Sequence, residues 1–475
     1  MKKIFTYMTL MAAALFTACS DDDIAQSSSV TSLDKYAVTG TMANVAEFVE
    51  GAGESDALRS KSQMYYDRVA GKLKFTWTKP EKNDPLYNEK VDHIGIFAEG
   101  SPETQINFKL DPDEALKVQE TSVTGVFMPS DGGVSPITGG TQYYSYFPYK
   151  AQSPVYFTSE AVPMSYSGQV QTANEQMGYY FAYEDALFLE SEIAAAEHLA
   201  GYEYMISDAT ATAGNHVHFH YSHVGSIVRF YMTCPSTADE NMFYDSLQVY
   251  NSQANFTIDA TMNLATKELA PTKTSHVMSL GFHPAIDMTC NNKHDSEDPY
   301  EKKISWYWKK TTPTRGYIMA YMMVAPIDLH EITESPTLYL IGRKASYYTL
   351  EEYNAAKGYK SGDEGYIADA AAYDALPKIQ KLKIYETRDA YNAAVDPDVN
   401  DATWSTMTNI DKMRDYQRKV YKAELVKLKL EAGKHHQWVP AASPDSPIEF
   451  QNISIQEWEN GPGFTNKDGA GTEDW

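Results

Sequence analysis

The feature that most constrains the fold is a succession of short segments in which apolar and polar residues alternate. Leu73, Phe75 and Trp77 alternate with a lysine and a threonine, which is the pattern of a strand that buries one face. Similar segments recur along the chain, separated by irregular loops, and no strand–helix–strand alternation is present. We therefore predict an all-β fold built of antiparallel β-sandwiches with helical insertions.

Further strands are predicted from the same alternation and from runs of β-branched and aromatic residues. They cover residues 91–97, 142–147, 216–232, 247–250, 256–258, 318–324, 337–341, 426–430 and 453–455. A region from residue 349 to about 421 interrupts them and contains helical patterns. We expect helices at 350–356, 367–376 and 410–421, the last with Asn409 as its N-cap.

The length of 475 residues predicts two domains. A turn at Cys234-Pro235 marks the boundary, so we expect an N-terminal sandwich over 36–235. A C-terminal sandwich over 236–475 would carry the insertion at about 345–421.

The N-terminus resembles a bacterial lipoprotein signal. Two lysines precede a short apolar run, and a small alanine stands directly before Cys19. The resemblance implies a signal peptide over 1–18, acylation of Cys19 and an acidic, Ser-rich tether over 19–35. Three aspartates follow Cys19 at once, as in lipoproteins that are exported to the outer face of the outer membrane. The alternative is a secreted protein whose signal ends in cysteine by chance.

The charge limits the partners. The formal net charge is −24, and cleavage before Cys19 removes two lysines and no acids, which leaves −26. Such a chain would be repelled by nucleic acid and by anionic membrane surfaces. No second apolar run approaches membrane-spanning length, so we expect the membrane to be reached only through the lipid on Cys19.

The two remaining cysteines are Cys234 and Cys290. Export would permit a disulfide between them, but they are equally compatible with two buried thiols. No cysteine and histidine spacing indicates a zinc knuckle. We expect no cofactor.

Several segments, in their order, resemble the fimbrillin family (Mfa-like and FimA-type subunits of type V pili). The segments are F-T-W at 75–77, V-D-H-I-G-I-F-A at 91–98, Y-Y-S-Y-F-P-Y at 143–149, H-V-G-S-I-V-R-F at 223–230, V-A-P-I-D at 324–328, L-E-A-G-K-H-H-Q-W at 430–438 and I-S-I-Q-E-W at 453–458. The resemblance implies two tandem transthyretin-like sandwiches, a lipoprotein precursor and a structural or adhesive role without catalysis. The long insertion departs from the family pattern, which leaves stalk, tip and anchor roles open.

The resemblance also implies a mechanism of assembly. Stalk subunits of the family are cut after an arginine that follows the first strand. Loss of that strand opens a hydrophobic groove in the first domain, and a strand of a neighbouring subunit fills this groove. Arg59 fits the cleaved position best, and Arg68 is the weaker candidate because it lies closer to the strand at Leu73. Arg59 is also compatible with an ordinary solvated loop. The implied partners are other pilus subunits, the outer membrane through the lipid, and a host protein or glycan receptor.

Two other groups of residues are candidates for a binding site. His216, His218 and His220 share one strand face with His223 nearby, and imidazole is a common metal ligand. No further ligand is identifiable, so we interpret them as a polar strand face and predict no metal site.

Trp306 and Trp308 also alternate. They could stack on sugars, although packing in a core or at an edge is the simpler reading. A sugar platform would suit the alternative function of a surface glycan-binding lipoprotein in a nutrient-uptake system. No catalytic motif supports an exported hydrolase.

Overall fold

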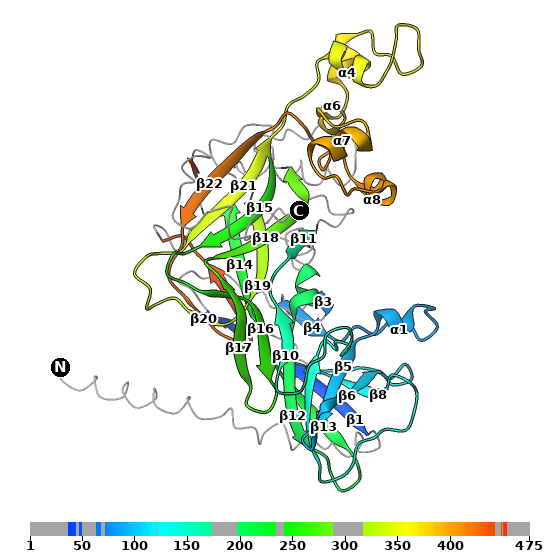
Figure 1. Ribbon diagram of the computed structural model, residues 1–475, viewed down its shortest axis with the longest axis vertical. Coiled ribbons are helices and arrows are strands. Elements are labelled where there is room, and N and C mark those ends of the chain that lie inside the picture. Colours follow the sequence, from blue (N-terminus) through cyan, green and yellow to red (C-terminus); the bar gives the residue numbers. More distant parts are fainter. Residues whose placement is uncertain are drawn as a thin grey trace, which may run out of the picture.

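The structure is a computed structural model that describes residues 37–43, 47–49, 63–67, 72–119, 121–172, 197–233, 242–287, 317–441, 448 and 450–453. Within these ranges the chain is mostly β with short helices (Figure 1). This confirms the predicted all-β class with helical insertions. None of the helices in the described ranges is long and apolar enough to cross a membrane.

The first sheet closes on itself. Its order is β1 (Val38–Ala43), β13 (Val217–His223), β12 (Met205–Thr210), β9 (Gln142–Phe147), β5 (His93–Ala98), β6 (Ser101–Leu110) and β8 (Ser122–Pro129), with β7 (Lys117–Val118) beside β8. An additional pairing between β1 and β8 joins the two ends of this order. Each of these strands except the two-residue β7 therefore contributes side chains to one enclosed core.

Trp77 lies at the centre of that core. Its side chain is 1% exposed, and its ring makes edge-to-face contacts with Phe127, Phe147 and Tyr221 at centroid distances of 5.2, 5.4 and 5.6 Å. The predicted strand leading to Trp77 is observed as β4 (Lys72–Thr76), which pairs with β3 (Gln63–Asp67). The inward position of Trp77 agrees with the alternation.

A second and larger core is formed by the remaining sheets together with residues such as Phe97 and Tyr146 of the closed sheet. A six-stranded sheet contains β11 (Gln169–Thr172), β18 (Val277–Asp287), β15 (Met242–Tyr250), β21 (Thr337–Lys344), β22 (Gln417–Glu424) and β25 (Gln451–Ile453). A four-stranded sheet contains β19 (Tyr317–Val324), β14 (Ser226–Thr233), β24 (Lys434–Trp438) and β2 (Glu47–Val49). Smaller sheets contain β10 (Val162–Ser165), β16 (Phe256–Asn263) and β17 (Glu268–Ser275), and β20 (Ile327–Asp328) with β23 (Lys429–Leu430).

The predicted strand over 216–232 is divided between two sheets. β13 ends at His223 in the closed sheet, and β14 begins at Ser226 in the four-stranded sheet. The break falls at Gly225, where an added Cβ would lie 2.6 Å from the Sδ atom of Met323. Residues 234–241, which contain the predicted boundary at residue 235, lie outside the described ranges.

The strand directions differ from the prediction at four places. Most pairings are antiparallel, as expected, but β1–β13, β11–β18, β14–β24 and β2–β24 are parallel. Each parallel pair joins strands that are far apart in the sequence, so no short turn dictates their direction. Periodicity within one strand carries no information on such partners.

The insertion is a group of short helices at the end of the molecule opposite to β1, β8 and β13 (Figure 1). It contains α4 (Leu350–Ala356), α5 (Ala370–Asp374), α6 (Lys378–Lys381), α7 (Arg388–Ala394) and α8 (Asp401–Thr406). Elsewhere the described chain has α1 (Tyr87–Lys90) and the 3-10 helix η2 (Glu197–Tyr202). The predicted helix at 350–356 is confirmed as α4, and the helix expected at 367–376 is shortened to α5.

The helix predicted at 410–421 is wrong. Gln417–Glu424 forms β22, which pairs with β21 on one side and with β25 on the other. Its sequence is rich in good helix formers, but the hydrogen bonds and the burial of Val420 and Tyr421 in the sheet outweigh a weak local propensity. The strand expected at 426–430 is reduced to the two residues of β23.

Candidate functional site

The strand β1 closes the first sheet by pairing on both of its edges. Val38 to Met42 align in parallel with β13, and Val38 to Ala43 align antiparallel with β8. Both neighbours use β1 to satisfy backbone N–H and C=O groups that would otherwise stand at open edges. β1 is therefore a candidate for strand exchange, since its removal would leave a gap of one strand width.

The inner face of β1 fills apolar pockets of the closed core. Val38 and Met42 are each 0% exposed. Gly40 lies between them, and a Cβ added to it would come within 2.8 Å of the Tyr221 ring and 3.1 Å of the Phe127 ring. The glycine thus permits two aromatic rings to pack directly against the backbone of β1.

The outer face of β1 carries two threonines that hold a histidine of β13. The Oγ1 atoms of Thr39 and Thr41 lie 2.5 Å from Nδ1 and 3.2 Å from Nε2 of His218. Thr41 also lies 2.5 Å, Oγ1 to Oγ1, from Thr124 of β8. A hydrogen-bonded chain of side chains therefore crosses all three strands at the position of β1.

Burial keeps the imidazole of His218 neutral. Desolvation, followed by the nearby ring of His220, lowers the pKa of His218 to about 4. The two rings meet edge to face with centroids 4.5 Å apart. A neutral imidazole has one donor and one acceptor nitrogen, which suits a position between two hydroxyl groups.

The four histidines singled out in the sequence do not form one cluster. His218 and His220 meet on the outer face of β13, whereas His216 precedes the strand. His223 instead pairs through Nδ1 with the buried carboxylate of Glu203 at 2.7 Å. The described part of the chain contains no group of three or more His, Cys, Asp or Glu side chains arranged to hold a metal ion.

A second strand edge is covered by side chains that sequence reasoning missed. The amide of Gln169 donates to the carbonyl of Met323 at 2.6 Å and accepts from its N–H at 2.8 Å. Gln171 accepts from the N–H of Tyr321 at 3.0 Å. Two buried amide side chains of β11 thus take the place of a backbone partner for β19. The Q-x-Q spacing was the available signal, but nothing in it identifies the strand it serves.

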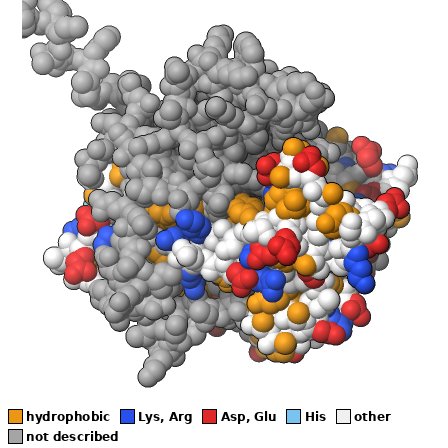
Figure 2. Space-filling view, turned by 90° about the horizontal axis from the view of Figure 1, so that it is seen from above, with side chains coloured by type: hydrophobic (Ala, Val, Ile, Leu, Met, Phe, Trp, Pro, Cys, Tyr) orange, Lys and Arg blue, Asp and Glu red, His pale blue; other side chains and the backbone are white. Residues whose placement is uncertain are grey.

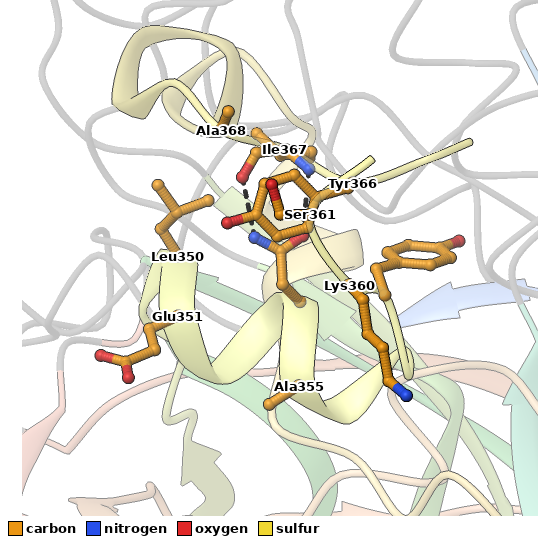
Figure 3. Close-up of a pocket in the computed structure, with 10 residues that line it drawn as sticks. Leu350, Glu351, Ala355, Lys360, Ser361, Tyr366, Ile367 and Ala368 are labelled. Atoms are coloured by element: carbon orange, nitrogen blue, oxygen red, sulfur yellow. Dashed lines mark hydrogen bonds between the residues drawn. The ribbon is translucent and has the colours of Figure 1, made fainter. Parts of the chain in front are cut away.

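The helical insertion contains an open cleft of about 590 Å³. One side is the N-terminal part of α4, with Leu350 and Glu351, and the other is the loop that carries Lys360, with Tyr366 between them (Figure 3). Tyr359 also lines it. The cleft therefore combines two aromatic rings, apolar side chains and one charge of each sign.

Asn354 fixes the shape of this cleft. Its side chain is 6% exposed; it donates to the carbonyl of Ile367 at 2.8 Å and accepts from the N–H of the same residue at 3.0 Å. A capping box between Thr349 and Glu352 starts α4. Three glycines with positive φ, Gly358, Gly362 and Gly365, turn the intervening loop.

The other residues predicted to be functional lie outside the described ranges. They are Cys19, Arg59, Arg68, Cys234, Cys290, Trp306 and Trp308. Lipidation, cleavage, a disulfide and sugar stacking at these positions stay predictions.

No protein-family model matches the sequence, and no curated protein matches it. The chain is similar to solved structures of cell adhesion and fimbrial proteins from Bacteroides. A candidate cell adhesion protein from Bacteroides ovatus is 14% identical over 64% of this chain and 81% of that chain, with a TM-score of 0.31. A candidate cell adhesion protein from Bacteroides fragilis is 8% identical over 88% and 97%, with a TM-score of 0.28. A fimbrial protein from Bacteroides vulgatus is 9% identical over 54% and 78%, with a TM-score of 0.22.

Proposed function

We propose that this protein is a fimbrillin-like surface lipoprotein that assembles into a pilus by exchanging β1 for a strand of a neighbouring subunit. The observation that carries the proposal is the pairing of β1 with β8 and β13 on its two edges. A strand in this position can be replaced by another strand of similar pattern, because backbone hydrogen bonds supply most of the recognition.

The position of β1 in the sequence suits such an exchange. Both β1 and β2 precede Arg59, the preferred cleavage candidate. A cut after Arg59 would separate the lipid on Cys19, β1 and β2 from the rest of the chain. The fragment would then be held without a covalent link, by the hydrogen bonds of β1, by the burial of Val38 and Met42 and by the pairing of β2 with β24. Each of these side chains contributes on the order of 1.5–3 kcal/mol when fully buried, so displacement by a competing strand is energetically feasible.

The gap left by β1 defines what the incoming strand must supply. Its inner face needs a very small residue at the position of Gly40, because the rings of Tyr221 and Phe127 occupy the space there. It also needs one apolar side chain two positions before that residue and one two positions after it. Its outer face needs hydrogen-bonding groups opposite His218 and Thr124. We expect the donor strand to follow this pattern.

The lipid on Cys19 would deliver the precursor to the outer membrane surface. Subunits that are cut lose this attachment on assembly, whereas an uncut subunit keeps it and acts as the anchor. Structural and adhesive roles are both compatible with this scheme.

The test is exposure of the acylated precursor to an arginine-specific protease. We expect a new N-terminus at Ser60 and ladders that resist boiling in detergent. Arg59→Ala should abolish both, while Arg68→Ala, the matched control, should leave them unchanged. An intact monomer under all conditions, or ladders that persist in Arg59→Ala, would contradict the proposal.

A further inference from the structure

We propose that the cleft between α4 and the loop from Tyr359 to Ala368 binds a short, uncharged oligosaccharide. The cleft volume of about 590 Å³ is typical of small-ligand sites, which span roughly 300–1,000 Å³. Its lining comes from one continuous stretch of the insertion. A ligand in the cleft would therefore contact this one stretch of the chain.

The walls supply the two kinds of contact that a sugar ring requires. A pyranose has an apolar C–H face and a rim of hydroxyl groups. Tyr359 and Tyr366 line the cleft half-buried, so each offers apolar ring surface together with a phenolic hydroxyl. Ser361, Glu351 and Lys360 are exposed at the cleft and provide donors and acceptors for hydroxyl groups.

The charges of the cleft favour an uncharged ligand. Glu351 and Lys360 are the two charged residues of its lining and have opposite sign. Neither forms an ion pair with another residue in the described ranges. The described surface at this end of the molecule mixes apolar side chains with both signs of charge (Figure 2). A phosphorylated or strongly anionic ligand would require several cationic groups, which this cleft lacks.

The cleft is shaped before any ligand arrives. The two hydrogen bonds of Asn354 hold the loop against α4. Beneath the cleft, the buried rings of Tyr348, Tyr353 and Tyr373 form a small core against which Tyr359 and Ile367 pack. A rigid site loses little conformational entropy on binding, which favours measurable affinity for a small ligand.

A peptide strand is a poorer candidate for the occupant. The lining belongs to α4 and to a loop, so it offers no open sheet edge for strand addition. α4, which lines the cleft, also lies at the opposite end of the molecule from β1 (Figure 1). Binding here is therefore independent of strand exchange and goes beyond the proposed role in assembly.

The experiment uses the uncut mature chain and an immobilised panel of neutral di- to tetrasaccharides built from glucose, galactose, mannose and N-acetylglucosamine. Binding of at least one member is expected, with its affinity measured by calorimetry. Tyr366→Ala should weaken that affinity by about tenfold or more through loss of the aromatic surface, and Lys360→Ala should weaken it severalfold. Tyr156→Ala removes a tyrosine that is 60% exposed outside the cleft and should leave the affinity unchanged.

The outcomes separate this inference from the proposed assembly. Lack of binding to every member of the panel, or equal affinity of Tyr366→Ala, Lys360→Ala and wild-type protein, would overturn it. Lys360 is exposed, so its variant tests the site even if Tyr366→Ala loses stability. Arg59→Ala should bind the sugar as well as wild-type protein does; a variant that binds sugar but forms no ladder leaves both proposals standing.

Discussion

Thr39 of β1 lies directly opposite His218 of β13, and its hydroxyl oxygen is 2.5 Å from Nδ1 of the imidazole. The same ring reaches Thr41 through its other nitrogen. One side chain of β13 therefore contacts two residues of β1 on the face that points away from the core. This adds a side-chain tie to the backbone pairing of the strand that we propose to be exchanged.

Acid should weaken the closed sheet through His218. Its pKa is about 4 in the folded protein, against an ordinary value of 6.5, so the unfolded chain binds more protons between these values. The free energy of unfolding should therefore fall as the pH drops from about 6.5 to about 4, by at most about 3 kcal/mol.

Urea unfolding between pH 7 and pH 4 measures this dependence. His218→Gln should flatten the curve in this window. An unchanged slope in His218→Gln would show that other groups carry the pH dependence.

Gly40→Ala should destabilise the protein by roughly 1–3 kcal/mol, because the new methyl group would collide with the rings of Tyr221 and Phe127. Gly100→Ala is the matched control, since a Cβ at that position meets no atom within 4 Å. Denaturant unfolding of both variants gives the comparison. Equal stability of the two would mean that the rings move aside at little cost.

Gln169→Leu should cost about 1–3 kcal/mol of stability, since it leaves the backbone groups of Met323 buried without partners. It should also promote concentration-dependent association, because the edge of β19 becomes available to another strand. Sedimentation velocity and urea unfolding test the two effects, with the exposed Gln380→Leu as control. A monomeric variant of wild-type stability would show that β19 needs no such cover.

Asn354→Ala should loosen the loop that forms one wall of the cleft. Loss of its two hydrogen bonds exposes the N–H of Ile367 to solvent, and hydrogen exchange at that amide should accelerate by roughly tenfold or more. Asn88→Ala, which replaces an exposed asparagine of α1, should not alter it. Unchanged exchange in Asn354→Ala would show that the buried tyrosines alone hold the loop.

The local sequence pattern was enough to predict the all-β class and several of the strands. It was not enough to predict which strands pair with one another. The aromatic run at 142–147 coincides with β9, since alternation and burial are properties of the strand itself. The break at Gly225 within residues 216–232 depends on the segments that pack against it, and so does the strand at Gln417–Glu424. A short stretch of sequence does not contain those segments. The roles of Gln169 and Asn354 were missed for the same reason. Gln169 binds the backbone of Met323, far along the chain, and Asn354 binds the backbone of Ile367, beyond the end of α4.

The closure of the first sheet also has a consequence for the order of folding. His218 follows Thr39 by 179 residues, so β1 can pair with β13 only after that length of chain has been synthesised. Contacts of such long sequence separation form slowly. Until β13 has been made, one edge of β1 therefore lacks its partner, and a strand from another copy could pair with that edge before β13 does.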